Sequence, residues 1–213
     1  AHSLGSKYLG KHACTYADFT TFSFQAIKTL TTGDGGLLVI KDKKLLEKGK
    51  RLRWFGIDRS KKQLGIWEND VKELGYKYQM NDIAASLGLA GLKQINSIIK
   101  KRILLFKEYE KNLNHSLISI IGKSKTNKYV NCPWLITIIV EKGKKQLIDK
   151  LRKNGIESAQ VHYRNDRYSV FGKRLKNLYN MDKLENKYLV LPLYPKMKLN
   201  DVKRICRVIN SGW

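Results

Sequence analysis

The 213-residue sequence has few cysteines and no long apolar segment. Cys14, Cys132 and Cys206 are odd in number, far apart and outside any Cys-x-x-Cys spacing, so we expect reduced thiols in a cytoplasmic protein. No apolar run is long enough to span a bilayer, and the first residues show no signal-peptide pattern. The length suits one or two domains with a buried core.

Histidines are also scarce, and they form no ligand pattern. His2, His12 and His115 lack the mutual spacing of a zinc site, and no cysteine stands at ligand distance from them in the sequence. The sequence therefore predicts that the protein holds no metal.

Acidic residues are few beside basic ones. There are 42 Lys and Arg against 18 Asp and Glu, which gives a formal net charge of +24. Such a charge attracts polyanions, so nucleic-acid binding is one hypothesis. However, the basic residues are dispersed, and no zinc finger, RRM-type aromatic motif or basic zipper is present. A lysine-rich solvated surface explains the charge and would also suit a diphosphate-bearing substrate.

One lysine stands in a distinctive context. Lys28 lies in the run F-S-F-Q-A-I-K-T-L-T-T-G-D-G-G, residues 22 to 36, between a strand-like stretch and a glycine turn. An amine that is partly removed from water is easier to deprotonate, and a neutral amine can attack a carbonyl to form a Schiff base. The alternative is an ordinary surface lysine, because the chain has many.

Three sequence blocks share a resemblance. The run at 22–36 resembles the cofactor-lysine segment S-F-H-x-x-K-x-x-T-T-G-E-G-G of the DegT-type sugar-nucleotide aminotransferases, a branch of the fold-type I pyridoxal-phosphate enzymes. The block L-G-Y-K-Y-Q-M-N-D-I-A-A at 74–85 is similar to that family's G-Y-x-Y-x-M-x-D/E-x-x-A-A. Q-V-H-Y-R at 160–164 and L-P-L-Y-P at 191–195 resemble its C-terminal landmarks.

The resemblance implies an α/β fold in two parts. Residues 1–95 would be the C-terminal part of a large, cofactor-binding domain, and 96–213 a connector helix with a small α+β domain. A-H-S-L-G at 1–5 looks like the family's D-x-A-H-x-L-G, so the aspartate for the pyridinium nitrogen and the N-terminal phosphate loop would precede Ala1. A truncated chain, a partial reading frame and a separate chain for the other half all remain open.

The activity that the resemblance implies is transamination. Lys28 would hold pyridoxal 5'-phosphate as a Schiff base and shuttle the proton, while an amino donor, usually glutamate, supplies the amino group for a nucleotide-linked keto-deoxy sugar. Ser23 would contact the cofactor phosphate, and Gln25, where many members have histidine, would donate an amide hydrogen bond. Alternatives are a catalytically incomplete or regulatory fragment of the same fold and, less favoured, a basic nucleic-acid-binding protein.

Further site residues follow from the other two blocks. Lys77 stands where many members have an asparagine that reaches the phosphate across a homodimer with a shared active site, and a lysine can serve the same dianion. Tyr78 is a substrate candidate that can equally be a packing residue. His162 and Arg164 would border the sugar-nucleotide pocket, with Arg164 at the diphosphate; a structural role for His162 is the alternative.

The pattern along the chain predicts the elements around these residues. We expect Lys28 in a loop facing a cleft, and a functional loop at 56–75. Residues after Leu113 look polar and loop-like until Trp134. The expected strands are 17–24, 37–40, 134–140, 157–162 and 188–191. The expected helices are 42–55, 82–94 (capped by Asn81 or Asp82), 98–112, 144–153, 168–179 (an irregular helix) and 200–210.

Overall fold

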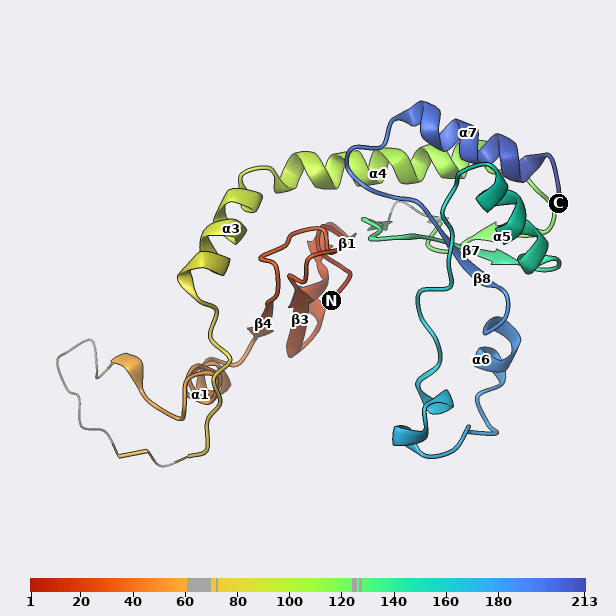
Figure 1. Cartoon of the computed structure of the whole chain (residues 1–213). Coiled ribbons are helices and arrows are strands. Elements are labelled where there is room, and N and C mark those ends of the chain that lie inside the picture. Colours follow the sequence, from red (N-terminus) through yellow and green to blue (C-terminus); the bar gives the residue numbers. More distant parts are fainter. Residues whose placement is uncertain (61–69, 72, 124–125, 127) are drawn as a thin grey trace. The chain divides into compact units, whose positions relative to one another are not determined.

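The chain divides into two compact units, which are described separately. A computed structural model describes residues 1–60, 70–71, 73–123, 126 and 128–213 (Figure 1). The first unit is Ala1–Asn96 and the second is Ser97–Trp213. The division expected from the sequence falls between residues 95 and 96.

The first unit is built around a β-hairpin. Strands β3 (Phe19–Ser23) and β4 (Gly36–Ile40) pair antiparallel, from Phe19 opposite Ile40 to Ser23 opposite Gly36. The β-branched and aromatic residues of β3 favour this extended structure. Both expected strands are confirmed, and so is the loop between them that contains Lys28. A shorter hairpin, β1 (Lys7–Tyr8) with β2 (Lys11–His12), precedes them.

Two helices of this unit begin at side-chain caps. Helix α1 (Lys43–Arg53) starts after Asp42, whose carboxylate accepts from the backbone N–H groups of Lys44 and Leu45. Helix α3 (Asp82–Leu92) starts after Asn81, which accepts from Ala84 N at 2.8 Å, so Asn81 is the cap. Each cap pairs a backbone donor that the helix itself leaves unpaired. Half of the functional loop expected at 56–75, residues 61–69 and 72, lies outside the described residues.

The second unit is a three-stranded antiparallel sheet covered by helices. Strands β5 (Ile118–Ile120), β7 (Ile136–Val140) and β8 (Tyr188–Leu191) are ordered β5-β7-β8. Helices α4 (Ile95–Asn112), α5 (Lys144–Lys153) and α7 (Leu199–Asn210) pack against it (Figure 1). The short elements β6 (Tyr129–Val130) and α6 (Tyr179–Leu184) complete the unit.

Alternating residues of the central strands form the core. Ile136, Ile138 and Val140 on β7 face the helices, because the side chains of a strand point to opposite faces in turn. Apolar residues of the three helices meet them there. They are Leu105, Phe106, Tyr109, Leu147, Leu151, Val202, Ile205, Cys206 and Ile209. The core of the second unit therefore follows directly from the periodicity of its strands and helices.

Three expectations for the second unit are wrong. The residues after Leu113 include strand β5, which lies in the stretch expected to be a loop. The strand expected at 157–162 is reduced to one bridge, Ala159 with Val190, because the chain then turns away to bury Arg164. The helix expected at 168–179 is a 3-10 turn, Ser169–Phe171, that ends at Gly172 with φ 94°. Sheet pairing and these turns depend on tertiary contacts that local patterns do not contain.

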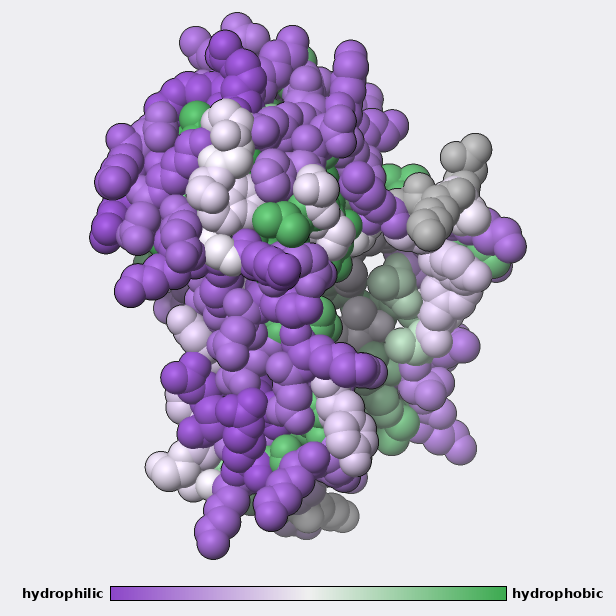
Figure 2. Space-filling model, turned by 90° about the vertical axis from the view of Figure 1, so that its right-hand side faces the viewer, coloured by the Kyte–Doolittle hydropathy of each residue, from purple (hydrophilic) through white to green (hydrophobic). Residues whose placement is uncertain are grey.

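The surface is largely hydrophilic on the face shown in Figure 2, where hydrophobic residues occur in small groups. This agrees with the expected lysine-rich, solvated surface. No helix within the described ranges is both long enough and apolar enough to cross a membrane.

Adjacent leucines on α4 provide a test of the core. Leu105 is fully buried, whereas Leu104 is 47% exposed. We expect Leu105→Ala to lower the free energy of unfolding by about 2–5 kcal/mol, because it removes buried methyl groups and leaves a cavity. Leu104→Ala should change it by no more than about 0.5 kcal/mol. Urea unfolding followed by circular dichroism measures both, and equal effects would contradict the assigned core.

Candidate active site

The loop that carries Lys28 is closed by backbone hydrogen bonds. Phe24 N donates to Gly35 O, and Thr32 N donates to Phe24 O, each at 2.9 Å. Within the loop, Lys28 N donates to Gln25 O at 2.9 Å. Because the loop is tied at its base and again inside, Lys28 has a defined position relative to the end of β3.

Glycine is required at the return of this loop. Gly35 has a φ of 149°, and a Cβ there would lie 2.6 Å from Thr32 Oγ1. That hydroxyl donates to Asp34 O at 2.8 Å, so it has little room to move. The glycines of the T-T-G-D-G-G run therefore allow a tight return that side chains would block.

The same loop packs against helix α3 at two glycines. A Cβ at Gly88 would lie 2.9 Å from Thr32 Cγ2, and one at Gly91 would lie 2.7 Å from Leu30 Cδ1. Thr32 and Leu30 are both buried. Gly88 and Gly91 therefore allow the Lys28 loop to approach helix α3 closely.

The Lys28 amine is partly buried and has a basic neighbour. Burial lowers its pKa below the ordinary lysine value, because removal of water disfavours the ammonium form. Its Nζ lies 2.7 Å from Nε2 of His2. The sequence reasoning did not select His2, although it stands in the A-H-S-L-G block that carries part of the resemblance.

Ser23 and Gln25 stand beside the lysine loop. Ser23 is the last residue of β3, and its Oγ accepts from Gln25 N at 3.4 Å. Gln25 Oε1 accepts from Ile27 N at 3.2 Å, so its NH2 group can donate outward. The structure thus brings Lys28, Ser23 and Gln25 together on one hairpin end. Their contacts with a cofactor stay predictions.

Lys77 and Tyr78 each contact an aromatic ring. Lys77 pairs with Trp54 through a backbone bridge, and its Nζ lies 4.4 Å from the Trp54 ring centroid. Tyr78 is exposed and stacks on Tyr76 with ring centroids 5.0 Å apart. The ammonium of Lys77 is held over an aromatic face. The phosphate contact of Lys77 and the substrate contact of Tyr78 stay predictions.

His162 and Arg164 belong to the second unit and have different environments. His162 is exposed, and its ring lies 5.9 Å from that of Trp134. The Arg164 side chain is only 2% exposed and forms a two-pronged ion pair with Asp166, with both N–O distances at 2.5 Å. Its guanidinium also donates to Asp182 and to Leu175 O.

The Arg164 cluster organises the segment between residues 164 and 185. Arg174 joins it through Asp182 and Glu185, at 3.2 and 2.6 Å. The paired guanidinium holds the pKa of Asp166 at about 2, through hydrogen bonds to the charged form. This structural role was not expected from the sequence. The predicted contact of Arg164 with a diphosphate stays a prediction, and it would have to compete with these carboxylates.

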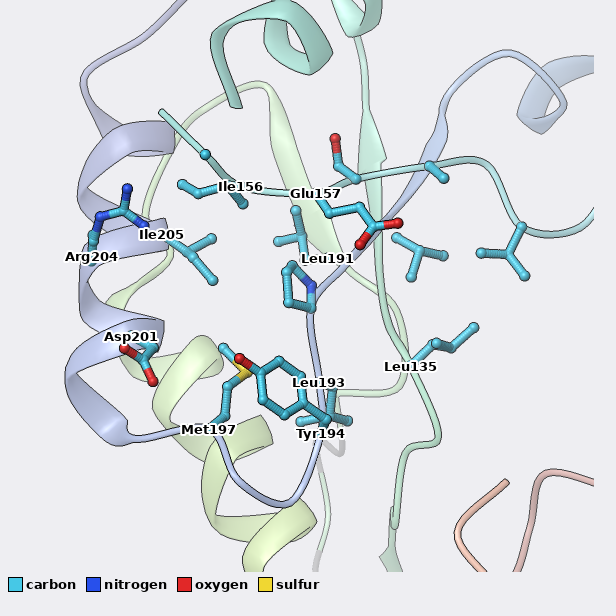
Figure 3. Close-up of a pocket in the computed structure, with 16 residues that line it drawn as sticks. Leu135, Ile156, Glu157, Leu191, Leu193, Tyr194, Met197, Asp201, Arg204 and Ile205 are labelled. Atoms are coloured by element: carbon cyan, nitrogen blue, oxygen red, sulfur yellow. The ribbon is translucent and has the colours of Figure 1, made fainter. Parts of the chain in front are cut away.

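A cavity of about 450 Å³ opens in the second unit (Figure 3). Its apolar lining includes Ile156, Leu193 and Met197, and Glu157 and Asp201 add carboxylates. None of the predicted site residues lines it. The cleft expected beside Lys28 is therefore not this cavity.

Comparison with known proteins gives the family. The DegT/DnrJ/EryC1/StrS aminotransferase family matches residues 1–210. The chain is 35% identical over 95% of its length to a UDP-4-amino-4,6-dideoxy-N-acetyl-beta-L-altrosamine transaminase of Campylobacter jejuni, and 32% identical over 99% to a GDP-perosamine synthase of Escherichia coli O157:H7. It covers 54% and 56% of those two proteins, so it spans about half their length.

A solved structure agrees with this result. The putative sugar aminotransferase Spr1654 from Streptococcus pneumoniae, in its PLP form, superposes with a TM-score of 0.87 at 28% identity, over 99% of this chain and 55% of that one. The chain belongs to the DegT/DnrJ/EryC1/StrS aminotransferase family. The expected fold class, part of a fold-type I pyridoxal-phosphate transferase, is confirmed.

The Arg164 cluster predicts a pH-dependent stability. Because the folded-state pKa of Asp166 is below its unfolded value, the pair stabilises the fold above about pH 4 and loses this effect as the pH falls toward 2. Asp166→Asn should lower the thermal midpoint clearly at pH 6, and the difference from the unsubstituted protein should shrink steadily below pH 4.

Asp149→Asn is the matched control, because Asp149 forms an ion pair with an exposed arginine, Arg152. It should leave the midpoint almost unchanged at either pH. An Asp166→Asn effect that is constant between pH 6 and 2 would contradict the assigned role of the carboxylate.

Proposed function

We propose that this chain is the Lys28-bearing part of a pyridoxal-phosphate-dependent aminotransferase that acts on a nucleotide-linked keto-deoxy sugar. The observation that carries the proposal is the Lys28 amine, which is partly buried, lowered in pKa and fixed in a hydrogen-bonded loop. Membership of an aminotransferase family supports the same reaction class.

The residues around Lys28 suit pyridoxal phosphate by their chemistry. An amine with a lowered pKa can bond to the aldehyde, while the Ser23 hydroxyl and the Gln25 amide can donate to phosphate oxygens. Lys77, if brought to the same group, would add a cation. When bound, the cofactor supplies an aldehyde and an electron sink.

Lys28 has two tasks in this proposal. Its Nζ would hold the cofactor through the aldehyde, and as a free amine Nζ would accept a proton from the α-carbon of the amino donor. Both tasks require a neutral amine near neutral pH, which burial favours. The tight glycine return and the packing on α3 keep Nζ in place for each transfer.

The substrate class rests on the relatives. Both curated relatives described above are named for nucleotide-linked amino sugars, one with UDP and one with GDP. We propose glutamate as the amino donor, with His162 and Tyr78 beside the sugar nucleotide and Arg164 near its diphosphate. We also propose a cytoplasmic homodimer whose active site is shared between subunits.

A second candidate function is a catalytically incomplete or regulatory fragment of the same fold. Two observations favour it: the chain spans about half the length of its curated relatives, and Leu30 carries the only hydrophobic side chain that is buried in the described part of the first unit. Nucleic-acid binding is a weaker alternative that rests on charge alone. Retention on DNA or RNA that falls steeply with salt would support it.

Substitution of Lys28 tests the proposal. Protein incubated with pyridoxal phosphate should gain the visible absorbance of lysine-bound cofactor, and borohydride reduction should fix the cofactor on the peptide that contains Lys28. Lys28→Ala should lose both signals, because no other amine occupies the same loop.

Lys41→Ala, at an exposed lysine just after β4, is the control and should keep both signals. If the unsubstituted protein takes up no cofactor, the fragment reading is the better one. If Lys28→Ala takes up as much as the parent, the assignment of Lys28 is wrong.

A further inference from the structure

His2 and Lys28 form a pair of basic groups in close contact. The 2.7 Å between Nζ and Nε2 is a hydrogen-bond distance, and the two residues are 26 positions apart in the sequence. His2 directly precedes a short turn in which Ser6 N donates to Ser3 O and Gly5 is buried with a φ of 88°. Two separate segments thus place an imidazole against the lysine amine.

The contact has only some compatible protonation states. A neutral imidazole can accept a hydrogen bond from the ammonium of Lys28 or donate one to its neutral amine. An imidazolium beside an ammonium places two positive charges at hydrogen-bond distance, which is unfavourable. Hence the ionisation of either group must alter that of the other, and the two titrate as a coupled pair.

We propose that His2 is a positioning residue that holds the Lys28 amine and sets its protonation state, a role in catalysis that rests on the proposed function of Lys28. Neutral His2 retains the ammonium by accepting its hydrogen bond. Protonated His2 repels it, so the amine releases its proton to water more readily. His2 thereby acts on the reaction through Lys28.

The surroundings leave His2 as the group best placed for this role. The adjoining segments carry other charged or titratable groups: Lys7, Lys11 and His12 on the β1–β2 hairpin, Asp18 before β3, and Asp34 after the loop. Burial lowers the pKa of Lys28, and the imidazole of His2 lies at hydrogen-bond distance from its Nζ.

Titration of His2 by NMR, without any cofactor, is the first test. In protein labelled with 15N-histidine, the His2 ring should titrate at lower pH than in the Lys28→Met variant, because the ammonium disfavours the imidazolium. The expected difference is on the order of half to one pH unit, since His2 is exposed to screening solvent. His12, in the same spectra, should give the same titration curve in both proteins.

The reactivity of Lys28 is the second test. Reductive methylation with formaldehyde, located by mass spectrometry, reports the fraction of neutral amine. In a plot of the logarithm of the Lys28 methylation rate against pH, the parent protein should show a shallow step in the pH range where His2 ionises. His2→Gln should give an unbroken slope of about one, since only one group then titrates. His12→Gln should keep the step.

The two tests must agree in size, because the coupling between two sites is reciprocal. The step in Lys28 reactivity should equal the displacement of the His2 titration. The proposal is overturned if Lys28→Met leaves the His2 curve in place, or if the step survives in His2→Gln. Neither measurement needs the cofactor. If the coupling is measured but the protein takes up no cofactor, the proposed function is wrong and the coupling of His2 with Lys28 still holds.

Discussion

The close approach of the Lys28 loop to helix α3 is the contact on which the candidate active site depends. Thr32 and Leu30 reach the helix only because Gly88 and Gly91 carry no side chain there. The loop base is fixed by Phe24, Gly35 and Thr32, so any displacement of the loop would move Nζ away from His2. A reactive lysine amine must be held at a defined position, and the packing of the loop against α3 provides this for Lys28.

The two units are stabilised in different ways. The second unit buries a continuous core of strand and helix residues, together with the Arg164 carboxylate cluster. The first unit has hydrogen-bonded loops, capped helices and glycine contacts, and its exposed apolar residues include Leu37, Ile83 and Leu87. The lysine loop is therefore stabilised by its own hydrogen bonds and by the packing of Leu30 and Thr32 on α3, without a continuous apolar core.

Much of the local structure could be predicted. The alternation in β3, the apolar stripe of α4 and the polar cap Asn81 are short-range signals, and the structure contains the elements they indicate. The segment after Ala159 could not be predicted in this way. Its Q-V-H-Y pattern is typical of a strand, but the chain leaves the sheet because Arg164 is buried among carboxylates that come as much as 21 residues later.

The sequence by itself determined the family, the fold class and the choice of Lys28, because three motif blocks carry that information in the identity and spacing of their residues. Tertiary structure alone decided the neighbours of those residues. It brings His2 into contact with Lys28 and Thr32 into contact with Gly88, and it pairs the Arg164 guanidinium with carboxylates. Apart from the contact of Arg164 with Asp166, these contacts join segments distant in the chain, and their geometry exists only after the intervening chain has folded.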